Sequence, residues 1–205
     1  MSGHSEVKTL KIRSQSSEYE VLIGSGVFDQ VVDSSESVIV ADSRFKNDFK
    51  SAIADRCIFV DALEKNKNLS TVEEVIIGLQ ARKVRSISTV IAVGGGIIQD
   101  LMTMVSSIYM RGIKWIYAPT TLLAMTDSCI GGKSSINTRT VKNLIGNIYP
   151  PTKIYIDTDF LKTLSEIDYL CGLAEASKIC FCKGEKEFKK FLEFADSRKS
   201  DELVD

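Results

Sequence analysis

The sequence predicts an α/β fold, in which a parallel β-sheet is covered by helices and followed by a helical segment. Short apolar, β-branched runs alternate with longer helical patterns between residues 37 and 157, and from Ser165 onward the pattern is helical. Such alternation is typical of parallel strands joined by right-handed crossovers. We therefore expect an α/β domain over residues 1–160 and the incomplete beginning of a helical domain over residues 161–205.

The strands follow from their residue patterns, taken in chain order. Residues 7–12 and 19–24 predict a hairpin that leads into a glycine turn. Further strands are expected at residues 37–42, 57–61, 88–93, 115–118 and 153–157. The run at 88–93 is apolar throughout, as expected for a strand that is covered on both faces.

The helices are expected at residues 44–54, 69–84, 97–110 and 184–205. Ser70 and Glu73 have the spacing of a capping box at the start of the second of these helices. The third is mostly apolar, which predicts burial, and the last is charged and amphipathic.

Composition excludes several classes of protein. Of the 205 residues, 44% are hydrophobic and 26% are charged, which excludes a disordered tail, a collagen-like fibre and a coiled coil. The 26 Lys and Arg residues balance 27 Asp and Glu residues. The resulting net charge of -1 argues against a protein that holds nucleic acid by bulk positive charge.

The sequence also predicts a cytoplasmic chain that does not enter the membrane. No run of about 18 apolar residues is present, and the polar N-terminus lacks the apolar core of a secretion signal. The five cysteines form no CxxC pair and are odd in number, which is typical of a reduced protein. Cys180 and Cys182 have the spacing of a metal pair, but a chance pair on a helix is the favoured interpretation.

A glycine-rich segment, GGGIIQD at residues 94–100, follows a buried strand and opens an apolar helix. Glycines let the backbone approach a ligand closely, and a helix N-terminus suits a pyrophosphate. The alternative is a tight turn with close packing, and the segment is not the GxGxxG fingerprint. An earlier segment, IGSG at residues 23–26, has no buried strand before it, which favours a simple turn.

The densest group of polar side chains lies between residues 110 and 146. It contains Arg111, Thr120, Thr121, Asp127, Lys133, Asn137, Arg139, Lys142 and Asn143. Loops beyond the carboxyl ends of parallel strands commonly bind ligands. Several cations with one carboxylate suggest a small anionic substrate, whereas the alternative is a solvated loop with ordinary salt bridges. Apolar residues between the polar ones indicate a packed loop and favour the binding site.

Glu175 and Lys178 are three residues apart on a predicted helix and so share one face. A helix ion pair is the simpler interpretation, and a metal ligand at Glu175 is the alternative. The chain has one histidine, His4, in a polar tail, so no Ser/His/Asp or Cys/His arrangement can be built.

Taken together, these motifs resemble the dehydroquinate synthase family of sugar-phosphate cyclases. The resemblance rests on GGGIIQD, YMRG, PTTLLAMTDS, GGKSSIN, KNLIG, IDTDFLKTL and GLAEASK, which match in order and spacing over nearly the whole chain. IGSG is similar to the family's early glycine turn, and LEKNKNL to its Glu/Lys nucleotide segment.

The resemblance implies a Rossmann-like NAD-binding domain followed by a helical domain, with NAD and a divalent metal, zinc or cobalt, in the cleft between them. It implies conversion of 3-deoxy-D-arabino-heptulosonate 7-phosphate to 3-dehydroquinate and phosphate, in the shikimate pathway. The substrate is a small anionic sugar phosphate, and family members are usually homodimers. Another cyclase, such as a valiolone or deoxy-inosose synthase, a non-catalytic NAD-binding module and an iron-dependent type of alcohol dehydrogenase are the alternatives.

The family's functional residues map onto this sequence position by position. The resemblance implies NAD contacts at Asp42, Glu64, Lys67, Gly94, Gly95, Gly96, Asp100, Thr120, Thr121, Lys142, Phe160 and Thr163, of which Asp42, Glu64 and Lys67 look like adenosine-side contacts. It implies substrate-binding and catalytic roles for Arg111, Asp127, Lys133, Asn143 and Lys178. It implies a metal ligand at Glu175.

The sequence departs from the family pattern at several points. Gln99 and Val141 replace glycines and are expected to crowd the backbone near ligands, and Ser134 replaces a threonine. The family's metal site also takes two histidines from the C-terminal domain, and this sequence contains neither. We therefore expect an incomplete synthase that is inactive by itself.

Overall fold

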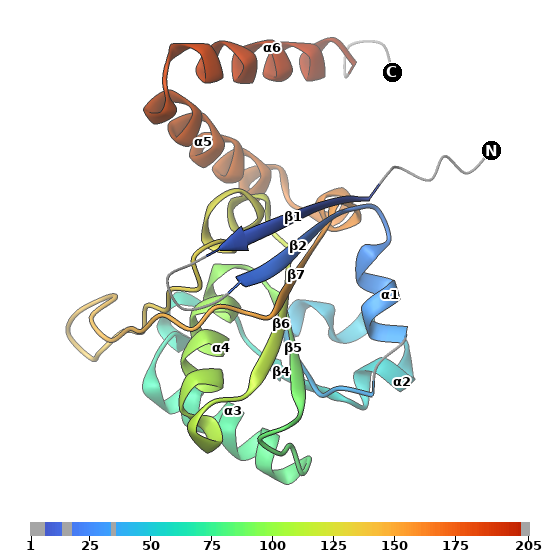
Figure 1. The fold of residues 1–205 in the computed structure, drawn as a ribbon, viewed down its shortest axis with the longest axis vertical. Helices are drawn as coiled ribbons and strands as arrows, with labels where there is room; N and C mark the ends of the chain where they lie inside the picture. The colour runs from blue at the N-terminus through green and yellow to red at the C-terminus, as the bar shows by residue number, and fades with distance from the viewer. Residues whose placement is uncertain (1–6, 14–17, 34–35, 202–205) are drawn as a thin grey trace.

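The computed structural model describes residues 7–13, 18–33 and 36–201, and its centre is a seven-stranded sheet (Figure 1). The strands are β1 (Lys8–Arg13), β2 (Glu18–Gly24), β3 (Ile39–Asp42), β4 (Cys57–Val60), β5 (Thr89–Gly94), β6 (Lys114–Pro119) and β7 (Lys153–Asp157). They lie in the order β1-β2-β7-β6-β5-β3-β4, and all neighbouring strands are parallel except β1 and β2. The predicted parallel sheet and the N-terminal hairpin are confirmed.

Helices cover both faces of this sheet. On one face lie α3 (Leu69–Ala81) and α4 (Gly96–Ile108), and on the other lie α1 (Val27–Asp33) and the short α2 (Ser51–Ala54) (Figure 1). Along β5, Val90 and Ala92 belong to the first core cluster, and Ile91 and Val93 to the second. All four side chains are fully buried, which explains why this strand is apolar at every position.

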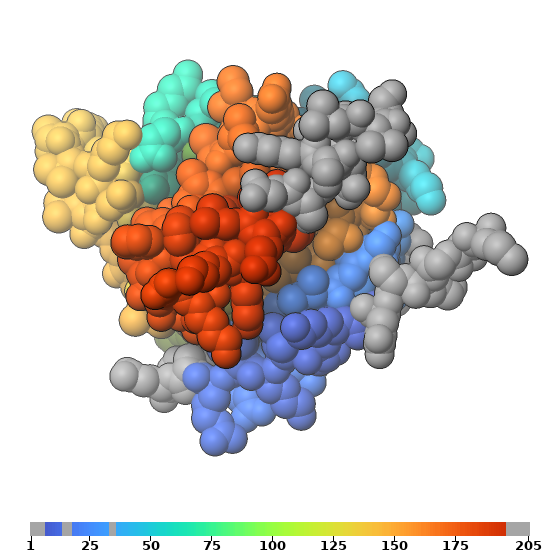
Figure 2. Space-filling model, turned by 90° about the horizontal axis from the view of Figure 1, so that it is seen from above, coloured from blue at the N-terminus to red at the C-terminus, as the bar shows by residue number. Residues whose placement is uncertain are grey.

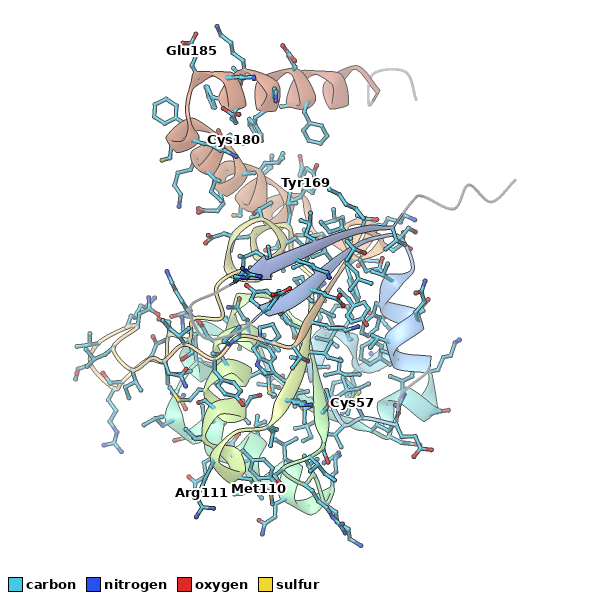
Figure 3. The ribbon with its side chains drawn as sticks, viewed as in Figure 1. Cys57, Met110, Arg111, Tyr169, Cys180 and Glu185 are labelled. Carbon is cyan, nitrogen blue, oxygen red and sulfur yellow. The ribbon has the colours of Figure 1, made fainter. Side chains whose placement is uncertain are left out.

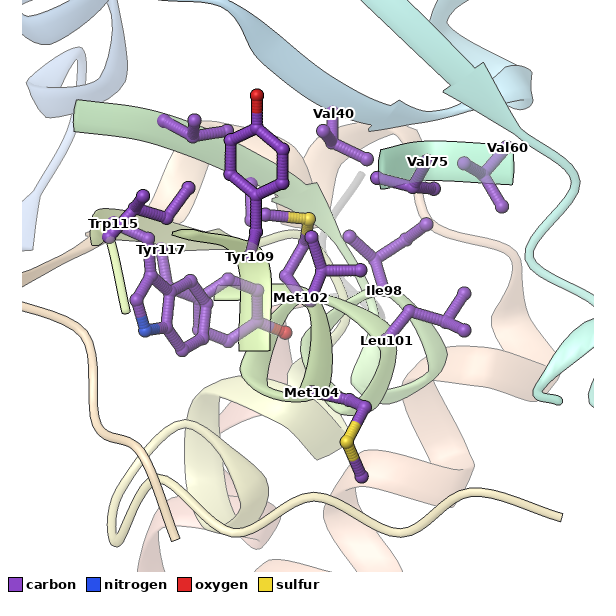
Figure 4. Packing of buried hydrophobic residues seen from close by; sticks show 14 of the residues in the cluster. Val40, Val60, Val75, Ile98, Leu101, Met102, Met104, Tyr109, Trp115 and Tyr117 are labelled. Atoms are coloured by element: carbon purple, nitrogen blue, oxygen red, sulfur yellow. The ribbon is translucent and has the colours of Figure 1, made fainter. Parts of the chain in front are cut away.

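The larger core cluster fixes α4 against the sheet. Ile98, Leu101 and Met102 of α4 pack near the aromatic side chains Trp115 and Tyr117 of β6 (Figure 4). These side chains are at most 1% exposed, so α4 has little freedom to shift. The start of α4 is therefore held at the end of β5, where the glycine-rich segment lies.

The prediction of one helix over residues 44–54 is wrong. The chain forms a short 3-10 helix, η1 (Ser43–Asn47), and then α2. The Asp42 carboxylate caps η1 by accepting a hydrogen bond from Arg44 N at 3.1 Å. The Asp48 amide bonds to the carbonyl of Phe45, three residues back, which tightens the turn and ends it.

The predicted capping box is also wrong. The side chain of Asn68 caps α3, because its Oδ1 accepts a hydrogen bond from Thr71 N at 3.0 Å. Asn68 has the extended backbone of an N-cap residue, with φ -143° and ψ 172°. Ser70 lies one residue inside the helix and makes no capping contact.

The turn at residues 24–26 is a structural turn. Gly26 has a φ of +70°, which favours glycine. The amides of Gly26 and Phe28 donate to the Asp157 carboxylate at 3.1 and 2.9 Å. Since an internal carboxylate occupies the start of α1, the interpretation of IGSG as a turn is confirmed.

Beyond the sheet, the chain continues through 3-10 turn η5 (Thr158–Thr163) into α5 (Glu166–Lys183) and α6 (Glu185–Asp201). Seen from above, the two helices lie over one end of the molecule (Figure 2). Gly172 allows α5 to pack closely, because a Cβ there would come within 2.4 Å of Leu122 Cβ. The domain boundary expected near residue 160 stays a prediction.

Across the described ranges, no helix combines the length and the apolar character that crossing a bilayer requires. The tail that contains His4 lies outside the described residues.

Candidate functional site

The glycine-rich segment forms a tight connection from β5 into α4. A Cβ on Gly94 would lie 2.4 Å from Ile98 Cγ1, and one on Gly95 would lie 3.2 Å from Thr121 Cγ2. The hydroxyl of Tyr117 donates to the carbonyls of Gly94 and Gly95 at 3.0 and 3.1 Å. Glycine is therefore required at position 94 for packing, and the hydrogen bonds from the buried Tyr117 fix the backbone of this connection.

The start of α4 has unused hydrogen-bonding capacity. Gly95 is the N-cap residue and supplies no side-chain cap for the first amides of this 13-residue helix. In the part of the chain that the structure describes, the buried hydroxyls of Thr120 and Ser128 have no partner. Ser128 Oγ is 3.6 Å from where a Cβ on Gly96 would stand. Uncapped amides, a missing Cβ and orphaned hydroxyls fit a polar, anionic ligand at this helix end.

Ser128 was not among the residues that sequence reasoning selected. Its only signal was its place directly after Asp127, and serine is too common in loops for that to be informative. Its position depends on a short π-helical turn, η4 (Ala124–Ser128), which brings it beside the glycine segment.

A second group of polar side chains, here called the Lys67 cluster, consists of Glu64, Lys67, Asp100, Lys142 and Asn143. The side chain of Lys67 is 9% exposed, and its Nζ lies 3.1 Å from Asp100 Oδ2 and 3.7 Å from Glu64 Oε1. Lys67 Nζ also donates to Asn143 Oδ1 at 2.8 Å. The structure thus joins residues predicted to contact NAD with Asn143 from the predicted substrate set.

The loop of residues 137–145 stands out from the body of the molecule (Figures 1 and 2) and completes this cluster. Asn137 Nδ2 donates to Glu64 Oε1 at 2.8 Å, and its backbone amide donates to the carbonyl of Lys67 at 2.8 Å. Asn143, with φ +57°, donates its amide to Asn137 Oδ1. Lys142 is mostly exposed and lies 3.9 Å from Glu64. Asn137 therefore braces the loop against the segment that carries Lys67.

The surroundings shift two carboxyl groups of the cluster in opposite directions. Burial raises the pKa of Asp100, and the hydrogen bond and charge of Lys67 oppose that rise. The hydrogen bond from Asn137 is the largest influence on Glu64 and lowers its pKa. The buried positive charge of Lys67 is balanced only while these carboxylates are ionised.

Lys133 follows two glycines in left-handed backbone conformations, Gly131 at φ +103° and Gly132 at φ +60°. Its side chain is exposed, and its carbonyl accepts a hydrogen bond from Gln99 Nε2 of α4 at 3.2 Å. Gln99 lies four residues after Gly95, so the glycine segment and Lys133 lie on the same side of the molecule.

A third group lies where α5 packs near η4. Lys178 forms an ion pair with Glu175, and this contact, with a smaller contribution from the charge of Asp127, raises the pKa of Lys178. The carboxylate of Glu175 is thus already neutralised by a cation. Within the described ranges, no group of three or more His, Cys, Asp or Glu side chains could hold a metal ion. The residues present do not fit a metal site.

Arg111 is not brought to these groups. It follows α4 and precedes β6. Since α4 runs antiparallel to the strands, Arg111 lies at the amino ends of the strands, opposite the glycine segment at their carboxyl ends (Figure 3). It has a left-handed φ of +67° and is exposed.

The remaining predicted contacts lie on the flank of the sheet near η1. Asp42 caps that turn, and the ring of Phe160 packs at 5.2 Å from Phe28 and 5.6 Å from Phe45. Phe160 and Thr163 line a hollow of about 320 Å³ together with these phenylalanines. An aromatic-walled hollow of this kind suits a flat ring.

A groove of about 960 Å³ lies between residues 64–70 and the 137–145 loop. It shares Glu64 and Lys142 with the Lys67 cluster, and Lys65 and Arg139 add positive charge. The glycine segment does not line it. The candidate site therefore centres on the start of α4 and the Lys67 cluster beside it.

A family model and curated relatives of similar sequence all point to the same family. A family model for the N-terminal part of 3-dehydroquinate synthase matches residues 57–170. The 3-dehydroquinate synthase of Pelagibacter ubique is 34% identical over 194 residues, which cover 87% of this chain and 53% of that protein. The chain spans about half the length of the curated relatives it matches.

Solved structures share the fold. The 2-epi-5-epi-valiolone synthase from Streptomyces hygroscopicus, with NAD+ and Zn2+ bound, aligns with a TM-score of 0.73 and 29% identity over 86% of this chain and 52% of that one. A 2-deoxy-scyllo-inosose synthase in complex with carbaglucose-6-phosphate, NAD+ and Co2+ aligns with a TM-score of 0.72 over 82% of this chain and 50% of that one. At 24% identity, the second likeness shows the fold alone.

Proposed function

The chain belongs to the 3-dehydroquinate synthase family, and on that basis we propose that it is the nucleotide-binding part of a 3-dehydroquinate synthase. The proposed reaction converts 3-deoxy-D-arabino-heptulosonate 7-phosphate to 3-dehydroquinate and phosphate. The observation that carries the proposal is the Lys67 cluster. There, Lys67 contacts both Asp100, the last residue of the glycine-rich segment, and Asn143, from the predicted substrate set.

NAD is the proposed cofactor, and when bound it would accept a hydride from the carbon that bears a substrate hydroxyl, as that hydroxyl loses its proton, and later return the hydride. The uncapped amides at the start of α4, with Thr120 and Ser128, would hold its pyrophosphate. The hollow beside Phe160 and Thr163 suits its adenine ring. Asp100 belongs to α4 and Lys67 is paired with it, so both would orient the remaining polar groups of NAD.

The substrate carries a phosphate and a carboxylate, and the chain offers exposed cations to both. Lys133 and Lys142 are exposed and lie on the loops next to the start of α4 and the Lys67 cluster. Lysine and amide side chains bind such oxyanions through charge-assisted hydrogen bonds. We propose that Lys133 and Asn143, together with Asp127 and Lys178, orient the sugar phosphate, and that Lys142 contacts NAD beside it.

A metal step cannot be derived from these residues. Glu175 is a single carboxylate paired with Lys178, and one carboxylate does not hold a catalytic divalent ion tightly. A second candidate function, which the pairing of Glu175 with Lys178 favours, is a non-catalytic NAD-binding module.

Two measurements test the proposal. The chain is first titrated with NAD by calorimetry, and saturable binding is expected. It is then mixed with the C-terminal half of a related synthase, NAD and zinc, and phosphate release from the heptulosonate phosphate is followed. Binding without turnover would favour the non-catalytic module, and no NAD binding would refute both functions. Turnover of glucose 6-phosphate in place of the heptulosonate phosphate would indicate a different cyclase.

The homodimer implied by the family also stays a proposal. Sedimentation of the chain at several concentrations would test it.

A further inference from the structure

Gln99 is a buried polar side chain that the proposed mechanism does not use. It lies in the first turn of α4 and is 3% exposed. Its Nε2 donates to the carbonyl of Lys133 at 3.2 Å, and its Oε1 has no partner in the described residues. A half-satisfied buried amide costs stability, so its presence calls for a reason other than packing.

The hydrogen bond from Gln99 reaches an otherwise open strand edge. Residues 132–136 pair with residues 145–149 in a short antiparallel ladder, in which Gly132 O accepts from Tyr149 N and Ser134 N donates to Asn147 O. Peptide groups alternate sides along an extended strand, so the carbonyl of Lys133 points away from that ladder and toward α4.

The neighbouring residue of α4 holds the same edge. The Asp100 carboxylate lies close enough to the backbone amide of Ser135 for that amide to lower its pKa, against the larger effect of burial. Two consecutive side chains at the start of α4, Gln99 and Asp100, therefore face two consecutive peptide groups of the segment that carries Lys133. Asp100 is also paired with Lys67, which links this edge to the Lys67 cluster.

This segment needs such anchors because glycines precede it. Gly131 and Gly132 both adopt left-handed φ values, and glycine backbone is the most easily reoriented. Gly132 is confined by Pro150, whose Cα would lie 2.3 Å from an added Cβ, and Gly131 donates to the Tyr19 hydroxyl. The direction in which the chain leaves these glycines decides where the exposed ammonium group of Lys133 lies.

We propose that Gln99 is a positioning residue, which fixes the main chain of Lys133 against the start of α4 and thereby sets the affinity of the Lys133 loop for a phosphate group. The inference rests on the proposed function for the role of Lys133 in binding an oxyanion. The anchoring itself rests only on the geometry of α4 and the strand edge.

The test compares Gln99→Met with a control variant, Thr103→Val. Methionine keeps the length of the side chain. It removes one hydrogen bond but also the unpartnered Oε1, and we expect these two effects on the stability of the fold to offset each other. Thr103 is buried one turn further along α4, and its hydroxyl has no partner in the described residues. Its replacement by valine leaves the contact between Gln99 and Lys133 intact.

The first measurement is amide hydrogen exchange at residues 134–136. We expect exchange to accelerate about fivefold or more in Gln99→Met, with an unchanged urea midpoint, and to stay unchanged in Thr103→Val. The second is titration with inorganic phosphate and, separately, with NAD. In Gln99→Met, phosphate affinity should fall about threefold to tenfold and NAD affinity by less than twofold, a split that a general loss of stability would not produce.

Unchanged exchange at residues 134–136 would overturn the proposal, and so would faster exchange with wild-type phosphate affinity. If the wild-type chain bound neither NAD nor phosphate, the proposed function would fail by itself. The exchange data would still decide whether Gln99 anchors Lys133.

Discussion

Replacement of Gly96 by alanine tests whether the start of α4 holds the pyrophosphate of NAD. The added Cβ would lie 3.6 Å from Ser128 Oγ, an ordinary contact, and Gly96 has no left-handed φ. Alanine is better than glycine within a helix by about 0.5–1 kcal/mol, so stability should stay the same or rise slightly. The methyl group would still fill the space beside the first free amides. We expect NAD affinity to fall about tenfold or more, or about 1.4 kcal/mol.

Gly94→Ala provides the contrasting case. Its Cβ would come within 2.4 Å of Ile98 Cγ1 and 2.8 Å of Ile98 Cβ, both in the buried core. Overpacking of this kind costs about 1–3 kcal/mol. The melting temperature should fall by about 2–4 °C for each kcal/mol in a chain of this size.

Calorimetric titration with NAD and thermal unfolding followed by circular dichroism separate the two effects. Gly96→Ala should lose binding and keep its melting temperature, whereas Gly94→Ala should lose stability. If Gly96→Ala bound NAD as the wild type does, with the same melting temperature, the reasoning that places a pyrophosphate at this helix end would be refuted.

Three further predictions follow from single contacts. Tyr117→Phe removes the donor to the carbonyl of Gly94 and should cost about 1–3 kcal/mol in urea unfolding; no loss would show that water replaces the hydroxyl. Asn68→Ala should cost about 1 kcal/mol by the same assay, and Ser70→Ala less than about 0.5 kcal/mol; the reverse order would contradict the observed cap. The pKa of Glu64 is lowered from its ordinary value of 4.5, so this group stabilises the fold above that pH, and the stability is lost as the pH falls through the lowered pKa. Glu64→Gln should therefore flatten the dependence of unfolding free energy on pH in the acid range, and an unchanged slope would argue against the shift.

The strands could be predicted from the sequence because their signal is local. Five buried runs of β-branched residues each gave a strand within one or two residues of its observed bounds, since a strand covered on both faces must be apolar at every position. The start of α4 was equally predictable, because Gly95 and Gly96 follow such a strand directly. The failures were at helix starts, where Asn68 rather than Ser70 supplied the cap.

The contacts within the candidate site could not be predicted from local patterns. Lys67, Asp100 and Asn143 meet only because the 137–145 loop folds back onto the segment before α3, and Asn137 holds it there. Arg111 shows the converse. It belongs to the same polar stretch of residues 110–146 as this loop, yet the length and direction of α4 carry it to the opposite end of the strands.

The two departures from the family's glycines, Gln99 and Val141, illustrate how burial decides the meaning of a substitution. Both were expected to crowd the backbone near ligands. Val141 is 47% exposed at a turn closed by the Thr138 hydroxyl, where its side chain meets the groove and solvent. Gln99 is 3% exposed, and its side-chain amide donates a hydrogen bond to the carbonyl of Lys133. An exposed side chain can turn toward solvent and so alters its surroundings little. A polar side chain that is enclosed by the core must form hydrogen bonds with the groups next to it. Any effect of these substitutions on ligand affinity should therefore be larger at Gln99 than at Val141.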